Sequence, residues 1–173
     1  MSKVILVNEQ DIALGNMDKM QAHEKGLLHR AFSIFIFNKK GDMLLQQRSQ
    51  AKYHSPCLWT NACCSHPEPG ETTAAAAYRR LKEEMGFNTN LTEAFSFVYK
   101  TAFENGLTEY EFDHVFIGSY DSQVIPDEKE VKDYSYTSMN NIRSGLQTHP
   151  HKYTSWFKIA FPKLEDYLAA TSV

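Results

Sequence analysis

The chain of 173 residues is 42% hydrophobic and 23% charged, and its formal net charge is −3. This composition is ordinary for a globular domain, and the weak negative charge excludes a general attraction for nucleic acid. No apolar stretch approaches the roughly 20 residues of a membrane helix. We therefore expect a single domain over residues 1–173 that binds neither nucleic acid nor membranes, while a monomer and a dimer both fit the composition.

Cysteine usage indicates a reducing compartment. Three cysteines, of which Cys63 and Cys64 are neighbours, do not form a disulfide framework. The apolar run at residues 4–7 is too short for a signal peptide and is followed at once by polar residues. We expect a cytoplasmic protein.

Alternating apolar residues and turn signals predict the strands. We expect them at residues 3–8, 29–37, 43–48, 95–103, 108–120 and 131–136. The turn at residues 38–42 predicts that the strands on its two sides pair as a hairpin. Asn105-Gly106 predicts a second hairpin, between the strands that flank it.

Apolar residues at helical spacing predict a central helix that starts near Glu71 and ends at Met85, where Gly86 closes it. Other helices are expected between residues 18 and 26, at 138–146 and at 156–168, where Pro162 should start or kink the helix. Strands on both sides of the central helix indicate an α+β domain with a mixed sheet. The sequence has no glycine-rich nucleotide-binding loop, so a nucleotide cofactor is not implied.

Glu109 and Glu111 lie two apart in a predicted strand, so both side chains leave the same face with Cα atoms ~6.6 Å apart. An isolated Glu-x-Glu is most simply a solvated strand face. Here Tyr110 and Phe112 take the other face and an apolar run follows, which favours a central strand in which the glutamates need partners.

Histidines could supply the remaining ligands of a cation. His23, His29 and His66 with the two glutamates would form a mixed nitrogen and oxygen site for Zn²⁺, Mn²⁺ or Mg²⁺. A lone histidine is more often a satisfied core or surface residue, and spacing does not prove that these five side chains meet. The histidines that we set aside as non-ligands are His54, His114, His149 and His151.

Several other groups have a structural and a functional interpretation. Cys63 and Cys64 are by default small buried residues, and only one of them can face a given pocket if the segment is extended. Trp156 is either a core aromatic or a π-face over a developing cation. Arg79 and Arg80 could simply form i,i+4 ion pairs with Glu83 and Glu84 on a helix surface. Lys19, Arg48 and Lys52 could likewise be scattered surface charges.

The central helix resembles the Nudix box, the motif Gly-x5-Glu-x7-Arg-Glu-hydrophobic-x-Glu-Glu-x-Gly-hydrophobic. The matching positions are Ser65, Glu71, Arg79, Arg80, Leu81, Glu83, Glu84, Gly86 and Phe87. Ser65 stands in place of the first glycine and Arg80 in place of an acid. Nudix hydrolases gather metals with acids on this helix, so Arg80 weakens such a site, and its guanidinium suits diphosphate oxygens instead.

Most of the chain resembles the metal-dependent, flavin-free (type 1) isopentenyl-diphosphate isomerases, a Nudix-fold family. The segments that carry the resemblance are residues 28–33, 44–49, 59–61, 63–67, 109–111 and 153–158. Thr60-Asn61 followed by Cys63-Cys64-Ser65-His66-Pro67 is the most specific of them. The resemblance implies a mixed sheet between helices in α/β/α layers with an N-terminal extension. It also implies a cytoplasmic enzyme of isoprenoid biosynthesis that acts on a prenyl diphosphate.

The resemblance also implies roles for individual residues. The catalytic divalent metal would be bound by His23, His29, His66, Glu109 and Glu111. Cys64 and Glu111 would be the acid–base pair on opposite faces of the substrate, supported by Tyr99, with Trp156 as the wall that stabilises a cation. Diphosphate and substrate contacts would come from Lys19, Arg48, Lys52, Arg80 and Ser33, and Glu84 with the Cys64 carbonyl would hold a second Mg²⁺.

Moving an unactivated double bond requires protonation at one carbon and deprotonation two bonds away, through a tertiary carbocation. A thiol, a carboxylate and an aromatic wall in a dry pocket fit that chemistry. Two alternatives stay open from the sequence. One is a Nudix hydrolase that cleaves a nucleoside or prenyl diphosphate, and the other is a silent Nudix-like module that senses a diphosphate or a metal.

Overall fold

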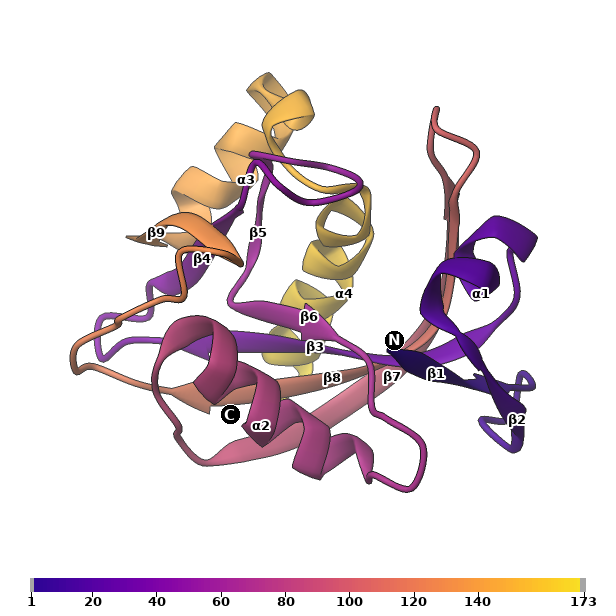
Figure 1. The fold of residues 1–173 in the computed structure, drawn as a ribbon. Coiled ribbons are helices and arrows are strands. Elements are labelled where there is room, and N and C mark those ends of the chain that lie inside the picture. Colours follow the sequence, from indigo (N-terminus) through magenta and orange to yellow (C-terminus); the bar gives the residue numbers. More distant parts are fainter. Residues whose placement is uncertain (1, 172–173) are drawn as a thin grey trace.

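The computed structural model describes residues 2–171, whose strands pair into one mixed sheet (Figure 1). The strands are β1 (Lys3–Val7), β2 (Ala13–Asp18), β3 (His29–Phe37), β4 (Met43–Arg48), β5 (Trp59–Asn61), β6 (Cys63–Ser65), β7 (Leu91–Ala102), β8 (Thr108–Ser119) and β9 (Val131–Thr137). The helices are α1 (Lys19–Lys25), α2 (Thr73–Met85), α3 (Met139–Thr148), the 3₁₀ turn η1 (Pro150–Lys152) and α4 (Ser155–Thr171). Within residues 2–171, no helix has the length and apolar character needed to cross a membrane.

β3 is the centre of the sheet. It pairs in parallel with β8 along its whole length and antiparallel with β6, and it meets β1 at a single position. β7 pairs with the far side of β8 as the predicted hairpin. β8 is therefore an interior strand, as its apolar residues indicated.

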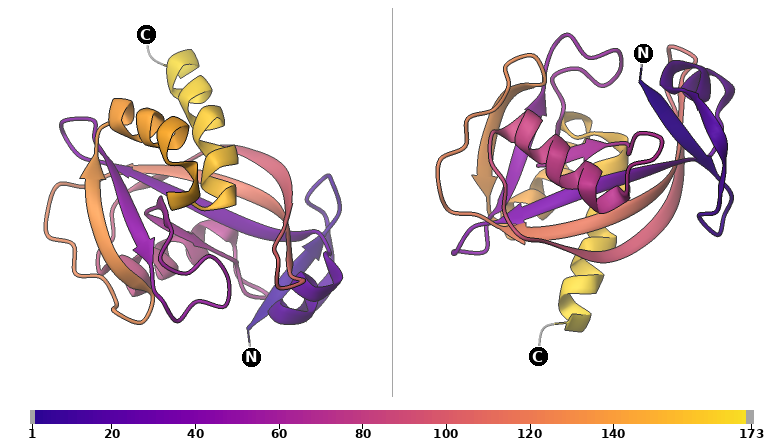
Figure 2. Two further views of the ribbon diagram at one scale, coloured as in Figure 1. Left: turned by 90° about the horizontal axis from the view of Figure 1, so that it is seen from above. Right: turned by 60° about the horizontal axis from the view of Figure 1, so that its bottom comes forward.

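Helices cover both faces of this sheet (Figure 2). Alternate residues of β3 build the two cores because neighbouring side chains point to opposite faces. Phe32 and Ile34 pack with α2, whereas Phe35 packs with α3 and α4. The α/β/α layering of an α+β fold is thus confirmed, and the N-terminal β1–β2 hairpin with α1 extends it.

The expected hairpin between β3 and β4 is wrong in its pairing. Only Phe37 and Met43 pair across the turn, and β4 then runs between β5 and β9. Residues 32–34 of β3 pair with β6 instead, and the Asn61 side chain donates to the Ile34 carbonyl at 3.0 Å. Hydrophobic alternation predicts a strand but not its partner, because pairing depends on distant segments.

The central helix begins and ends where its sequence predicted. The Thr72 hydroxyl accepts a hydrogen bond from the Ala75 amide, and Gly86 closes the helix in the left-handed conformation with φ 78°. α4, by contrast, starts at Ser155 and passes through Pro162, so this proline does not start the helix.

Replacing Gly86 by alanine should destabilise the fold strongly. A Cβ there would collide with the Ile125 carbonyl oxygen, in addition to the cost of positive φ. We expect a loss of more than ~2 kcal/mol in the free energy of unfolding, measured by urea denaturation. Gly106→Ala is the matched control, since Gly106 has φ 81° but open space around it. Equal losses in the two variants would show that the Ile125 contact does not matter.

Candidate functional site

The strand register brings three predicted site residues together. Glu111 of β8 pairs with His29 of β3 on one side and with Tyr99 of β7 on the other. Glu109 lies two residues away on the same face, and both glutamates are nearly fully buried. Residues that are paired across neighbouring strands share a face of the sheet, so the pairing explains this cluster.

His23 from α1 and His66, which follows β6, complete the cluster. Ligand atoms of all five predicted residues lie within 4.8 Å of one another, which confirms that the fold assembles them. The Nε2 atoms of His23 and His29 lie 3.1 and 3.2 Å from carboxylate oxygens of Glu109 and Glu111, respectively. His66 Nε2 lies 2.5 Å from the same Glu111 oxygen.

The donor set of this cluster fits a divalent cation, because imidazole nitrogens and carboxylate oxygens are the ligands that such ions take. The Nδ1 atoms of His23 and His29 lie 2.6 and 2.8 Å from the carbonyls of Lys19 and Leu27, which leaves Nε2 for a cation. Burial opposes ionisation of Glu109, but hydrogen bonds from His23 and His54 outweigh it and hold its pKa well below the usual range.

The pKa values of two histidines in the cluster are shifted in opposite directions. Burial lowers the pKa of His66, which favours the neutral ring that a metal requires. Burial acts in the same direction on His23, but its hydrogen bond to Glu109 outweighs burial and raises the pKa. Binding of a cation would therefore displace a proton from His23.

The two adjacent cysteines face opposite ways, as an extended segment requires. Cys63 is buried in the core under α2, whereas Cys64 lines a cavity. The Cys64 thiol donates to Asn61 Oδ1 at 3.1 Å and lies 3.5 Å from Ser33 Oγ. Burial, with the nearby Asp113 carboxylate, raises the pKa of Cys64 to about 12, so the thiol stays protonated at neutral pH.

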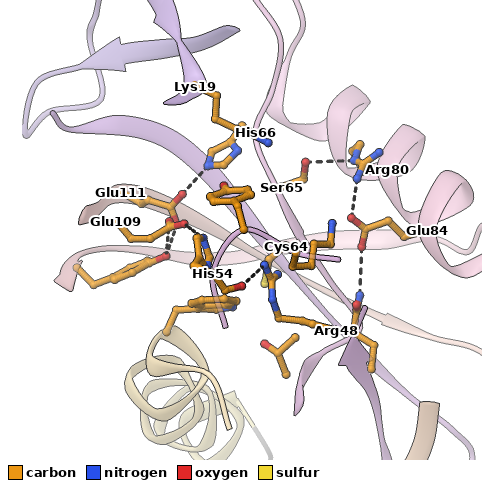
Figure 3. Close-up of a pocket in the computed structure, with 16 residues that line it drawn as sticks. Lys19, Arg48, His54, Cys64, Ser65, His66, Arg80, Glu84, Glu109 and Glu111 are labelled. Atoms are coloured by element: carbon orange, nitrogen blue, oxygen red, sulfur yellow. Dashed lines mark hydrogen bonds and ion pairs between the residues drawn. The ribbon is translucent and has the colours of Figure 1, made fainter. Parts of the chain in front are cut away.

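Cys64 and Glu111 line the same cavity, with Cys64 between the two glutamates and Arg80 in the view of Figure 3. The Tyr99 hydroxyl donates to Glu111. Burial and then the two glutamates raise the pKa of Tyr99 well above its usual value, so it acts only as a donor there. The predicted residues that line the cavity are Lys19, Arg48, Lys52, Cys64, His66, Arg80, Glu84, Tyr99, Glu109, Glu111 and Trp156.

The four predicted basic residues all face this cavity. Arg48 lies 5.0 Å from the Trp156 ring, and its Nε is buried without a hydrogen-bond partner among residues 2–171. Lys52 pairs with Glu130. Burial, and then the charge of Lys52, lowers the pKa of Lys19. Carboxylates already pair with Lys52 and Arg80, so the buried Arg48 Nε is a donor of this cluster that still lacks a partner in the described part of the chain.

The helix ion pairs are only partly those expected from i,i+4 spacing. Arg80 binds Glu84 at 2.6 Å and Glu83 at 2.6 Å, and it also donates to Ser65 Oγ at 3.1 Å. Arg79 binds Glu71 at 2.7 and 2.9 Å, much closer than Glu83 at 3.4 Å. Arg79 therefore connects α2 to Glu71 in the preceding loop, whereas Arg80 lines the cavity.

Trp156 has both of the environments considered for it. Its side chain is 4% exposed, which is typical of a core residue, yet it lines the cavity beside Cys64 and Glu111. Ser33 does not line the cavity. It lies beneath Cys64 and donates to Asp113 at 2.7 Å, so its position favours support of the thiol over contact with a ligand.

Some residues of the site were not predicted from the sequence. Gln46 donates to Glu84 at 3.1 Å and to the Ala62 carbonyl at 2.6 Å, and Asp113 is buried beneath Ser33. His54, which we had set aside, hydrogen-bonds to Glu109 at 2.8 Å. Gln46 lies in the segment 44–49 that carries the family resemblance, and Asp113 continues the alternation of Glu109 and Glu111 on the buried face of β8, a signal that could have identified it. His54 is part of no such pattern.

Comparisons with known proteins identify the family of this chain. Residues 27–157 match the NUDIX domain family. The chain is 49% identical over 155 residues to isopentenyl-diphosphate Delta-isomerase 2 of Photorhabdus laumondii, covering 90% of this chain and 88% of that protein. It is 46% identical over 172 residues to the isopentenyl-diphosphate Delta-isomerase of Pectobacterium atrosepticum, covering 98% and 95%.

Solved structures agree on the fold alone. The crystal structure of DR0079 from Deinococcus radiodurans superimposes with a TM-score of 0.79 at 17% identity, covering 94% of this chain and 98% of that one. A Nudix hydrolase from Mycobacterium smegmatis named RenU gives 0.62 at 15% identity, covering 98% and 96%. Together with the identity to the two isomerases, the domain match shows that this chain belongs to the type 1 isopentenyl-diphosphate isomerases of the Nudix superfamily.

Proposed function

We propose that the protein interconverts isopentenyl diphosphate and dimethylallyl diphosphate. The observation that carries the proposal is the shared cavity, in which a protonated thiol, a carboxylate and a basic cluster meet. The similarity to proteins that are named isopentenyl-diphosphate isomerases supports it. The reaction adds one proton and removes one, so no cofactor has to carry electrons.

The diphosphate anchors the substrate. Arg48, Lys52 and Arg80, with Lys19 nearby, offer the charge that phosphate oxygens need, and the unpartnered Arg48 Nε gives one free donor. Glu84 and the Cys64 carbonyl would hold a Mg²⁺, which would supply further positive charge for the diphosphate. This binding energy lies away from the reacting carbons and fixes their position.

Cys64 and Glu111 carry out the two proton transfers, one adding a proton to the olefin and one removing a proton from it. Tyr99 donates to Glu111 and stabilises its ionised form. The face of Trp156 stabilises the tertiary carbocation between the two steps. Glu111 is nearly fully buried and Cys64 half-buried, and a bound substrate would cover the thiol and exclude the water that otherwise traps a cation as an alcohol.

The divalent cation belongs to the cluster of His23, His29, His66, Glu109 and Glu111. When bound there, it supplies positive charge that lowers the proton affinity of Glu111 and fixes the five side chains. Zn²⁺, Mn²⁺ and Mg²⁺ all suit this mixed donor set. The enzyme needs no flavin.

Turnover in deuterated water tests the proposal. With isopentenyl diphosphate and Mg²⁺, we expect deuterium in dimethylallyl diphosphate, detected by mass spectrometry or NMR, because the added proton comes from an enzyme group that exchanges with solvent. Release of phosphate or pyrophosphate would indicate a hydrolase instead. Absence of both products would indicate a silent module that only binds the diphosphate. Either result would contradict the isomerase.

A further inference from the structure

His54 lies against the cation cluster without belonging to it. It occupies the loop between β4 and β5, is 5% exposed and lines the cavity. Its Nε2 lies 2.8 Å from Glu109 Oε1, and Figure 3 shows the ring beside the two glutamates. The cluster of five mutually close ligands does not include it.

Glu109 is contacted by polar groups of His23, His54, Tyr99 and the neighbouring Glu111. The hydrogen bond from His54 is shorter than those from His23 and Tyr99, and a cation bound to His23 would leave it in place. His23 Nε2 lies 3.1 Å from the same Oε1, and the Tyr99 hydroxyl is a long 3.4 Å from Oε2. His23 Nδ1 is held by the Lys19 carbonyl, so a cation would take the Nε2 lone pair of His23 and end its hydrogen bond to Glu109. The contact from His54 does not compete with a cation in this way.

The neighbours of His54 select the tautomer that donates to Glu109. Ser55 Oγ lies 3.3 Å from Nδ1 and can donate a proton to it, which leaves the hydrogen on Nε2. An Nε2–H group can only donate, and Glu109 Oε1 is the acceptor within reach. The loop therefore presents a donor to one oxygen of the carboxylate.

Packing holds the ring of His54 in this position. It stacks on Phe103 with centroids 4.6 Å apart and planes inclined by 9°, and Tyr53 and Trp156 meet it edge-on at 4.5 and 5.6 Å. Arg48 donates to the His54 carbonyl at 3.2 Å. Ser55 has φ 51°, an unfavourable conformation for a serine that the loop accepts directly beside His54.

We propose that His54 is a positioning residue for the cation site: its Nε2–H holds the Glu109 carboxylate in the orientation that binds the divalent cation. The inference rests on the proposed cation site and adds a residue to it. Outer-shell partners of metal ligands typically change affinity or activity by 10–100-fold when they are removed. Loss of the His54 donor should therefore appear as a weaker affinity for the divalent cation, measured in the absence of substrate.

Two variants separate the hydrogen bond from the packing. His54→Phe keeps an aromatic ring on Phe103 but removes the donor, and we expect its dissociation constant for Mn²⁺ or Zn²⁺ to rise ~10–100-fold. His54→Gln keeps an N–H donor near the Nε2 position and should recover most of the affinity. His151→Phe, on the exposed turn η1, is the control and should bind like the wild type. Affinity is measured by competition with a chelator, with circular dichroism as the check of folding.

The outcomes separate this inference from the cation site itself. A wild-type protein that binds neither ion would overturn both. If the wild type binds and His54→Phe binds as tightly, the cation site stands and the role of His54 is wrong. Equal weakening in His54→Phe and His54→Gln would show that the donor is not what matters, and this also overturns the inference. The glutamine variant decides the question if the phenylalanine variant does not fold.

Discussion

Cys64→Ala should reduce kcat for isomerisation by at least ~10³-fold, because it removes one of the two proton-transfer groups. Cys64 lines the cavity, and its thiol is held by Asn61 and Ser33. Substrate binding should change little, since the diphosphate contacts come from other residues. The measurement is a steady-state assay with isopentenyl diphosphate, accompanied by circular dichroism to verify the fold.

The adjacent cysteine gives a matched control. Cys63 is fully buried in the core beneath α2 and points away from the cavity. Cys63→Ala should cost roughly 1 kcal/mol of stability through lost packing and leave kcat within about threefold of the wild type. If Cys63→Ala were the inactive variant and Cys64→Ala the active one, the assignment of the thiol would be wrong.

Glu111→Gln should also reduce kcat by at least ~10³-fold. Glutamine has nearly the same shape as glutamate, so the packing between β3 and β7 is kept. Its amide cannot take up a proton, and it lacks the negative charge that Tyr99, His29 and His66 contact. A weaker cation site is expected in addition, since one ligand of the cluster is lost. The assay is run over a series of metal concentrations.

Metal titration separates these two consequences. If saturating Mg²⁺ or Mn²⁺ restores full turnover to Glu111→Gln, the carboxylate serves only to bind the cation and its role in proton transfer is excluded. Glu93→Gln is the control, because Glu93 lies on the neighbouring strand, is largely exposed and pairs with His114 outside the cavity. It should retain wild-type kcat.

The helices and most strands could be predicted because their signals are local. Thr72 and Gly86 mark the two ends of α2 through hydrogen bonding and backbone conformation within a few residues. Asn105-Gly106 marks the hairpin of β7 and β8 for the same reason. β5 and β6 were missed because three-residue strands carry too short a pattern. β2 was missed as well, because its residues are mostly exposed and show no apolar alternation. The turn at residues 38–42 sets Phe37 opposite Met43, but the pairing of β4 beyond it was predicted wrongly because β6 takes the place beside β3.

Candidate site residues could be predicted where residue type and spacing along the chain indicate their chemistry. Glu109 and Glu111 were singled out because two carboxylates on a buried strand face need partners. Strand alternation predicted that only one of Cys63 and Cys64 faces a pocket, and the family resemblance pointed to Cys64. His54 and Asp113 were not found. Asp113 follows Glu111 by two residues and so shares its buried face, which makes it detectable by the same argument. His54 has no such pattern, and its importance depends on the groups that the fold brings against it.

The residue types and local periodicity of this chain were enough to predict an α+β domain and a candidate set of cation ligands, whereas the pairing of Cys64 with Glu111 as acid and base came from the family resemblance. Local hydrogen bonding and side-chain alternation underlie the first two predictions. The parallel pairing of β3 with β8, which sets His29 beside Glu111, was decided by tertiary structure, as was the loop that carries His54 to Glu109. Such contacts join residues up to 82 positions apart, and they form only when burial of the two cores makes that arrangement the most stable one.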